Sequence, residues 1–410
     1  MKVMWVCNML LPEFAEKINE PVLAGGSWMV ALAKDMKTCN EIELVICAPY
    51  NGDTIKDLKV DNITYYAIPK KNMGEYWSSV TKKIKPDVIH IHGTEYEHAN
   101  ILIKSCPNER YVTSIQGLTS IYANHYLANL PYNVAKKYSF KDIIKRKNII
   151  KTQKDWFENG EIEKEIISNV NNIIGRTTWD KACVHMINPK AKYYYCSESL
   201  RDSFYKTKWS YDECEKNSIF ISQGTYPIKG LHMAIEALPQ LVKEYPGVKI
   251  YVAGNNISKA DTFMAKLKRG YYGRYIEKLI ESKNLKGKIV FLGPLDEKSF
   301  CDRMKKSHVF LSASSIENSP NSVGEAMLLG VPCVSSNVGG VSDMVKDKEE
   351  GFLYPFNETY MISYYVGKIF GNKELALSLS EKSKEKGEII FDRKNNLETT
   401  INIYKEVINK

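Results

Sequence analysis

Apolar segments alternate with helix-like segments along the 410-residue chain, and this alternation restricts the possible folds more than any other feature. Several of the apolar segments run continuously until a glycine ends them, as in KPDVIHIHG (85–93) and RYVTSIQG (110–117). Such runs are typical of strands buried in a parallel sheet. Strands that alternate with helices predict parallel α/β sheets, and 410 residues are too many for one ordinary core.

The strand-like segments form two series, separated by the polar stretch KTKWSYDECEKN. The sequence therefore predicts two doubly wound domains, 1–205 and 218–388, joined by a linker at 206–217. The segment 389–410 is predicted to be a C-terminal helix that packs back on the first domain. Strands are expected at 3–7, 42–49, 63–69, 85–93, 110–117, 171–176, 192–197, 218–224, 248–255, 287–294, 308–314 and 331–337, and helices at 230–247 and 395–408.

Composition indicates a globular protein of the cytoplasm. Hydrophobic residues make up 44% of the chain and charged residues 26%. The nine cysteines are irregularly spaced without a CxxC pair, which predicts reduced thiols and no metal site. The first residues, MKVMWVCNMLLPEF, do not resemble a signal peptide, and no run approaches the roughly 20 apolar residues of a membrane span.

The charge of +9 is concentrated between residues 133 and 154. This segment holds eight Lys and Arg residues and one acid, Asp142, so its net charge is 8 − 1 = +7. A helix over 138–151 would place Ile143, Ile144 and Ile150 near one side. Two interpretations stay open: a solvated insertion helix, or a surface that docks peripherally on the anionic inner face of a membrane. Nucleic acid is not an expected partner, because the segment has few aromatic residues and no known reader motif.

Glycines follow many of the predicted strands. Ligands of open α/β sheets bind at the carboxyl ends of the strands. Two such domains facing each other would enclose a cleft lined by these ends, and the cleft is the expected site of chemistry. The glycines in question are Gly25, Gly26, Gly93, Gly117, Gly224 and Gly254.

Two carboxylates, Glu317 and Glu325, flank a turn and a helix start within IENSPNSVGEAMLLGVPCV. Ser319 suits a helix cap, and Pro320 suits the first helical position. The free N–H groups and the dipole of a helix start can bind phosphate. Glu325 could then accept hydrogen bonds from a ribose and Glu317 from a sugar beyond the phosphate. The spacing alone fits equally well acids that interact only with the helix dipole.

Taken together, the motifs resemble the retaining GT-B glycosyltransferases of family four. The resemblance is carried by E-x7-E at Glu317 and Glu325 with the following EAMLLGVPCVSSNVGG and EEGFLY, and by PIKGLHMAIEAL, VAGNN and VFLGPL. It extends to the first domain through the glycine loop and through KPDVIHIHG. The resemblance implies a GT-B fold with two Rossmann-like domains, and it is stronger in the carboxyl half than in the amino half.

The resemblance also implies roles for individual residues. It places Glu325 on the nucleotide ribose, Glu317 on the donor sugar and Lys229 on the diphosphate. The remaining implied contacts are the helix start at Asn321, Ser322 and Val323, the glycine turn at Gly254, the base-binding stretch that ends near Leu295, and the first-domain loop at Gly25 and Gly26.

The sequence departs from the family pattern at three places. The usual Phe-Gly after the first glutamate is Ser319-Pro320, which keeps a turn but changes the loop. The arginine that precedes the lysine is missing, and Arg176 is a candidate for the second cation. The histidine expected after the fourth strand of the first domain is replaced by Gln116. His92 and Glu95, at a neighbouring strand end, are candidates to compensate.

The resemblance implies a glycosyltransferase that retains the anomeric configuration. No Asp-x-Asp motif is found, which predicts that the enzyme works without a metal. The catalytic set is expected to be Glu317, Lys229, Gln116 and His92, with no side-chain nucleophile. The donor would be a UDP- or GDP-sugar, and no cofactor would be bound permanently. The acceptor would be a saccharide or a lipid-linked saccharide, in surface polysaccharide synthesis. Two alternatives stay open: an isomerase or hydrolase of nucleotide sugars, and a non-catalytic subunit that binds them.

Overall fold

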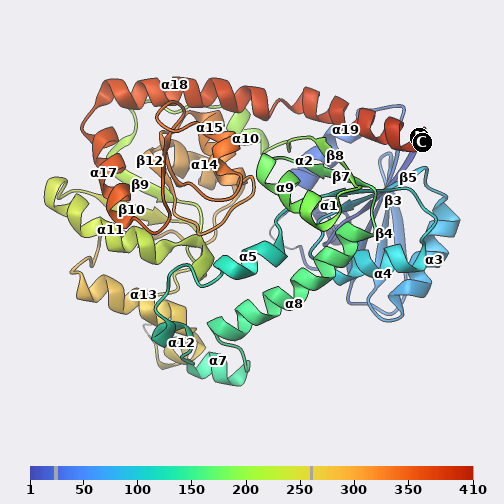
Figure 1. Cartoon of the computed structure of the whole chain (residues 1–410), viewed down its shortest axis with the longest axis horizontal. Helices are drawn as coiled ribbons and strands as arrows, with labels where there is room; N and C mark the ends of the chain where they lie inside the picture. Colours follow the sequence, from blue (N-terminus) through green and yellow to red (C-terminus); the bar gives the residue numbers. More distant parts are fainter. Residues whose placement is uncertain (23–25, 259–261, 410) are drawn as a thin grey trace. The chain divides into compact units, whose positions relative to one another are not determined.

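The computed structural model describes residues 1–22, 26–258 and 262–409 (Figure 1). Contacts divide the chain into two compact units, each of which contains one sheet. The segment 121–156 belongs to the second unit, although the sequence-based boundary assigns it to the first domain, and the last residues belong to the first unit. Unit 1 comprises 1–120, 157–200 and 391–410, and unit 2 comprises 121–156 and 201–390.

Unit 1 contains an eight-stranded sheet in the order β3-β4-β2-β1-β5-β6-β7-β8. Every neighbouring pair is parallel except β3 and β4. The strand order reverses between β1 and β5: later strands are added on one side of β1 up to β4 and on the other side from β5 onward. The carboxyl ends of β1 and β5 are therefore the expected ligand position. The strands are β1 (Lys2–Val6), β2 (Glu43–Tyr50), β3 (Lys56–Val60), β4 (Ile63–Pro69), β5 (Val88–His92), β6 (Tyr111–Ser114), β7 (Asn172–Gly175) and β8 (Lys192–Tyr195).

The C-terminal helix α19 (Arg393–Ile408) packs against β5 and α2 of unit 1. Tyr404 is fully buried there, and its hydroxyl accepts a 3.0 Å hydrogen bond from the indole of Trp5. Arg393 pairs with Asp35 at 2.7 Å and holds the other end of the helix. The other helices of unit 1 are α1 (Pro12–Lys17), α2 (Ser27–Met36), α3 (Met73–Ile84), α4 (Glu97–Ser105) and α9 (Thr178–Ile187), while α5 (Thr119–His125) and α8 (Ile149–Ser168) are shared with unit 2.

Unit 2 contains a six-stranded sheet in the order β11-β10-β9-β12-β13-β14, with every pair parallel. Here the strand order reverses between β9 and β12, so the loops that follow these two strands flank the expected ligand position. The strands are β9 (Glu215–Ile221), β10 (Lys249–Val252), β11 (Ile289–Phe291), β12 (Ser307–Ser312), β13 (Cys333–Ser336) and β14 (Phe352–Tyr354).

The helices of unit 2 fall into two groups. A small group, α6 (Tyr132–Ala135), α7 (Phe140–Ile144), α12 (Phe263–Lys268) and α13 (Tyr271–Ser282), is linked by contacts of α7 with α12 and of α6 with α13. The others are α10 (Asp202–Tyr205), the 3₁₀-helix η1 (Pro227–Lys229), α11 (Leu231–Glu244), α14 (Glu297–Lys305), α15 (Asn321–Leu329), α16 (Val341–Met344), α17 (Thr359–Phe370) and α18 (Lys373–Ile390).

The strands expected from the sequence are confirmed, within a few residues at their ends. The expected helix over 138–151 is wrong. A capping box of Ser139 and Asp142 starts α7, which ends at Ile144, and α8 begins separately at Ile149. Ile150 therefore does not share a helix with Ile143. All nine cysteines, each within the described residues, are free thiols. Within the described ranges, the structure contains no helix that is long and apolar enough to cross a bilayer.

Candidate functional site

Lys229 and Glu317 meet in unit 2, beside the point where the strand order reverses. Lys229 ends η1 after β9, and Glu317 lies in the loop after β12. The ammonium group donates to Oε1 of Glu317 at 2.5 Å. Desolvation alone would lower the pKa of Lys229, but the charges of Glu317 and Tyr226 outweigh it and raise the pKa. The structure therefore brings together, as a charged pair, the two residues that the sequence assigned to diphosphate and sugar.

Glycines fix the backbone of both loops. Gly230 has φ +67°, and a Cβ there would lie 1.7 Å from the carbonyl oxygen of Ala313, so only glycine fits between η1 and β12. Gly339 is equally restricted: its φ is +54°, and a Cβ would lie 1.9 Å from the carbonyl oxygen of Glu317. Gly340 donates its N–H to that same oxygen at 3.1 Å. The loop around Glu317 is thus held by backbone packing on two sides.

Helix α15 starts after Glu317, but its start differs from the sequence-based expectation. Pro320 is the N-cap rather than the first helical residue, and no side chain caps the helix, so the predicted Ser319 cap is wrong. Asn321 and Ser322 form the first positions of the helix and are half-buried. Val323 donates its N–H to the carbonyl oxygen of Pro320 at 2.9 Å, so this N–H is already bonded within the turn. The predicted phosphate contact therefore rests on Asn321 and Ser322.

Glu325 lies one turn into α15, where it is 3% exposed. Arg201 donates hydrogen bonds to both carboxylate oxygens of Glu325: Nε to Oε1 at 2.6 Å and Nη2 to Oε2 at 2.7 Å. The guanidinium also lies over the rings of Phe204 and Phe300, with centroid distances of 4.8 and 4.5 Å. Burial raises the pKa of Glu325, against the opposing effect of Arg201. Sequence reasoning missed Arg201, because it lies 124 residues before its partner in no recognisable motif.

The other predicted nucleotide contacts of unit 2 follow neighbouring strands. Gly254 comes after β10 with φ +95°, and its N–H donates to the carbonyl oxygen of Gly293 at 2.9 Å. Leu295 is half-buried and lies two residues after that glycine. The two glycines therefore hold together the loops that follow β10 and β11. Base binding by Leu295 stays a prediction.

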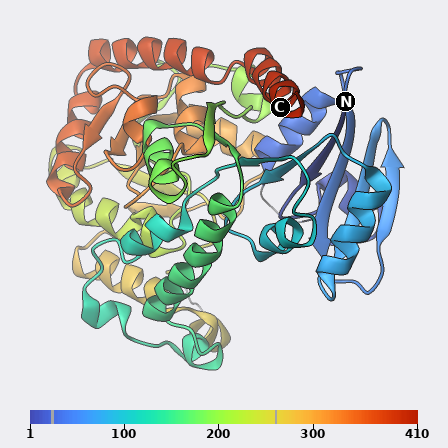
Figure 2. The same cartoon turned by 45° about the vertical axis from the view of Figure 1, so that its right-hand side comes forward.

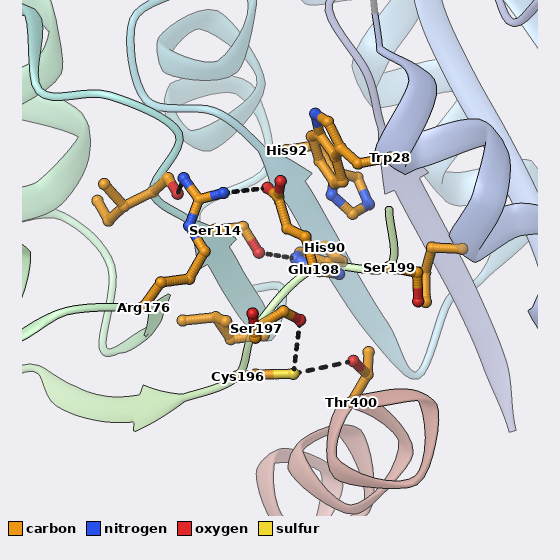
Figure 3. A pocket seen from close by; sticks show the side chains of 13 residues that line it. Trp28, His90, His92, Ser114, Arg176, Cys196, Ser197, Glu198, Ser199 and Thr400 are labelled. Carbon is orange, nitrogen blue, oxygen red and sulfur yellow. Dashed lines mark hydrogen bonds and ion pairs between the residues drawn. The ribbon is translucent and has the colours of Figure 1, made fainter. Parts of the chain in front are cut away.

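In unit 1, the predicted residues His92 and Arg176 line one small polar pocket (Figure 3). The pocket also contains Trp28 and Glu198, which sequence reasoning missed. Figure 3 shows the Glu198 carboxylate turned toward the guanidinium of Arg176, and the His92 ring beside the indole of Trp28. The complete lining is Trp28, Leu32, His90, His92, Ser114, Ile115, Ile174, Arg176, Cys196, Ser197, Glu198, Ser199 and Thr400.

His92 is the last residue of β5 and is 2% exposed. Burial, together with the neighbouring His90, holds the pKa of His92 well below its usual range, so the ring is neutral. Neither ring nitrogen of His92 has a hydrogen-bond partner among the described residues. The ring centroid lies 5.2 Å from that of Trp28. A buried neutral imidazole without a partner can accept or donate one hydrogen bond to a ligand.

Arg176, Gln116 and Glu198 form one cluster at this pocket. Nη1 of Arg176 pairs with Oε1 of Glu198 at 2.5 Å, and the amide of Gln116 donates to the same oxygen at 2.9 Å. Nη2 of Arg176 donates to the carbonyl oxygen of Gln116 at 2.7 Å. The proposed role of Arg176 as a diphosphate cation stays a prediction, and within unit 1 the charge of Arg176 is already matched by Glu198. No sequence signal pointed to Glu198.

Glu95 and Glu163 are two further acids of unit 1. Burial raises the pKa of Glu95 to about 7, and its Oε2 has no hydrogen-bond partner among the described residues. Glu163 is fully buried and accepts hydrogen bonds from the backbone N–H groups of Thr119 and Ser120 at 2.8 and 3.0 Å. Glu163 thereby fixes the loop that follows Gln116. Of the predicted glycine loop, Gly25 lies outside the described residues, and Gly26 is the N-cap of α2 with φ +62°.

Residues 204–386 match the family model "Glycosyl transferases group 1". Over this range the chain is similar to the glycosyltransferases of group 1. The matched range contains Lys229, Glu317 and Glu325, so it covers the site built above.

The curated relatives of this chain are distant. It is 26% identical over 192 residues to an uncharacterized glycosyltransferase of Methanocaldococcus jannaschii, spanning 47% of this chain and 45% of that protein. The chain therefore spans about half the length of this relative. It is 19% identical over 416 residues to the putative glycosyltransferase YtcC of Bacillus subtilis, spanning 100% of this chain and 93% of that protein.

Solved structures share the fold of the whole chain. The sucrose-phosphate synthase of Thermosynechococcus elongatus superposes with a TM-score of 0.73 at 14% identity, covering 100% of this chain and 99% of that one. Anabaena HepE in complex with UDP superposes with a TM-score of 0.71 at 13% identity, covering 99% and 100%. These similarities show the two-domain, Rossmann-like GT-B fold.

Proposed function

We propose that the chain is a retaining, metal-independent glycosyltransferase that moves a sugar from a nucleoside diphosphate sugar to a saccharide or lipid-linked saccharide. Surface polysaccharide synthesis at the inner face of the membrane is the proposed setting. The observation that carries the proposal is the Lys229–Glu317 pair beside the start of α15. It places one ammonium, one carboxylate and the positive end of a helix dipole within one set of loops.

The leaving diphosphate gains negative charge as the bond between the anomeric carbon and its phosphate oxygen breaks. Lys229 and the first residues of α15 stabilise that charge, which is a role of fixed cations and dipoles. The acceptor oxygen bonds to the anomeric carbon on the same face, and its proton passes to the departing phosphate oxygen. Glu317 orients the sugar through its hydroxyl groups, while Glu325 accepts hydrogen bonds from the ribose. UDP or GDP is the proposed nucleotide, and the complex of Anabaena HepE with UDP supports the first of these.

In unit 1, the proposal assigns the polar pocket to the acceptor side of the reaction. The neutral ring of His92 and the unbonded Oε2 of Glu198 offer hydrogen-bonding groups of the kind that sugar hydroxyls satisfy. Gln116 orients Glu198 through their 2.9 Å hydrogen bond.

A second candidate function is a nucleotide-sugar isomerase or hydrolase, and one observation favours it. The pKa of Glu95 is raised to about 7, which suits a general acid or base near neutral pH. Assays with and without an acceptor separate the two functions, because only the transferase needs an acceptor hydroxyl to consume the donor quickly.

The test starts with a panel of UDP- and GDP-sugars, each scored by the rise in unfolding temperature that bound ligand produces. With the donor known, Glu317→Gln should lower turnover about 100-fold or more. Binding of the nucleoside diphosphate should stay equal or become tighter, because Lys229 loses its internal partner. Lys229→Met should lower turnover and weaken binding of the diphosphate.

Glu374→Ala is the matched control, since this acid is exposed on α18. Near-normal turnover of Glu317→Gln would contradict the role of Glu317. Absence of stabilisation by every nucleotide sugar would contradict the proposed donor class.

A further inference from the structure

The small helices α7 and α12 of unit 2 carry an exposed apolar surface that no part of the proposed chemistry uses. Five apolar side chains lie on these two helices, with exposures between 47% and 74%. We define the α7–α12 surface by these residues and by the basic residues around them. The apolar residues are Phe140, Ile143, Ile144, Phe263 and Met264, and the basic ones are Lys141, Lys145, Arg146, Lys266 and Lys268.

The two helices are fixed to each other and to the body of unit 2. Helices α7 and α12 contact each other, and they lie side by side in both views (Figure 1, Figure 2). The carboxylate of Asp142 accepts hydrogen bonds from the N–H groups of Ser139 and Tyr271 at 2.9 and 3.0 Å. Two segments about 120 residues apart therefore build one surface, since 263 − 143 = 120.

The charges of this surface are mainly positive. The only acid within α7, Asp142, is used by the backbone bonds just described, while Lys141, Lys145 and Arg146 are all exposed. Helix α12 adds two exposed lysines at 266 and 268 and contains no acid. A surface of isoleucine and phenylalanine surrounded by lysine complements an anionic partner with an apolar interior.

We propose that the α7–α12 surface docks on an anionic lipid bilayer. Bulky apolar side chains enter the boundary between headgroups and acyl chains, and lysine and arginine remain among the lipid phosphates. A protein partner fits less well, because the buried centres of protein interfaces are depleted in lysine. Helices of five and six residues rest on the bilayer without crossing it. Docking of this kind is reversible and depends on salt.

The test is co-sedimentation of the full chain with lipid vesicles. One set contains phosphatidylcholine alone and the other adds phosphatidylglycerol, each at low and at high salt. We expect binding to the anionic vesicles at low salt, weaker binding at high salt, and little binding to the neutral vesicles. No donor or acceptor is needed, so failure of this proposal is distinguishable from failure of the proposed function.

Variants locate the docking surface. Ile143→Ser with Ile144→Ser should reduce the partition into anionic vesicles by about tenfold, because two exposed isoleucines no longer transfer into the bilayer. Ile389→Ser is the matched control: this isoleucine is 72% exposed on α18, and its replacement should leave binding unchanged. Lys145→Glu with Arg146→Glu should remove most of the salt dependence.

Three results would overturn the proposal. They are no binding of the wild-type chain to anionic vesicles at low salt, equal binding of the isoleucine double variant, and equal loss of binding in Ile389→Ser. If the double variant instead lost self-association in gel filtration and wild-type vesicle binding were absent, the surface would be an interface between two copies. Unchanged thermal unfolding of each variant establishes that it folds.

Discussion

Replacement of Arg201 by methionine tests how strongly unit 2 depends on its most buried ion pair. Glu325 is 3% exposed and receives two short hydrogen bonds from Arg201. Removing one partner of a buried pair leaves the other charge without compensation, which typically costs about 3–5 kcal/mol. Glu325 can reduce this cost by taking up a proton, because burial already raises its pKa. We therefore expect Arg201→Met to lower the free energy of unfolding by about 3 kcal/mol.

The loss should depend on pH in a defined direction. Because the folded-state pKa of Glu325 is raised, the folded protein holds this proton to a higher pH than the unfolded chain does. Its contribution to stability is therefore largest at low pH and falls as pH rises through the folded pKa. Without Arg201 the opposing effect on the pKa disappears, so Arg201→Met should lose more stability at about pH 8 than at about pH 5.

Urea unfolding followed by far-ultraviolet circular dichroism measures both effects. Arg303→Met is the control, since its partner Glu215 is 40% exposed and surface pairs contribute about 1 kcal/mol or less. Glu325→Gln introduced into Arg201→Met should recover most of the loss, because the uncompensated charge is then gone. The reasoning is refuted if Arg201→Met costs no more than Arg303→Met, or if Glu325→Gln recovers nothing.

Two further predictions concern stability. Burial lowers the pKa of His90 from 6.5 to about 3. The buried neutral ring therefore contributes fully to stability above pH 6.5, and this contribution is lost as the pH falls toward 3, because the unfolded chain takes up the proton first. Between neutral pH and pH ~5 the free energy of unfolding, measured with urea, should fall by about 2 kcal/mol less in His90→Gln than in the wild-type chain. His185 is exposed, and His185→Gln should leave this pH dependence unchanged. Gly230→Ala should cost more than about 1 kcal/mol because its Cβ meets the carbonyl oxygen of Ala313. Gly247→Ala, with open space around it, should change stability by less than about 0.5 kcal/mol, and an equal effect of both alanines would contradict the strain argument.

The sequence predicted most of the strands, including β5, which is buried along its whole length. Continuous apolar runs mark these strands, as in KPDVIHIHG around β5. Two strands were missed for physical reasons. The edge strand β3 (KDLKV) is mostly exposed and carries no apolar run, and β14 (FLY) is three residues long.

Side-chain partners distant in the sequence were not predictable. Glu317 and Lys229 were found because each lies within a recognisable local pattern. Arg201 and Glu198 were missed, because their roles arise only when the folded chain brings them to Glu325 and Arg176. The residues next to Arg201 and Glu198 in the sequence do not indicate which distant side chain each of them contacts.

The assignment of residues 121–156 to unit 2 was unpredictable for a similar reason. Two of the contacts that hold this segment are made by its backbone carbonyl groups. The carbonyl oxygen of Ala128 lies 2.6 Å from Nε2 of His232, and the carbonyl oxygen of His125 accepts a 2.8 Å hydrogen bond from the Ser315 hydroxyl. A carbonyl group is present in every residue, so the segment itself carries no distinguishing signal for these contacts. The same segment supplies α7, and its attachment to unit 2 is what combines α7 with α12 into one surface.

The Lys229–Glu317 pair links the two roles that the sequence suggested separately. In the structure the ammonium group already has an anionic partner. Under the proposed function, a donor diphosphate either takes up the remaining N–H donors of Lys229 or displaces Glu317. The backbone of Glu317 is held by Gly339 and Gly340, so Lys229 is released by rotation of one of the two side chains. We propose that the carboxylate turns away from the ammonium while Lys229 takes up the diphosphate. In this proposal, binding of the diphosphate and reorientation of Glu317 are one coupled event, so a sugar or nucleoside without a diphosphate should leave Glu317 on Lys229.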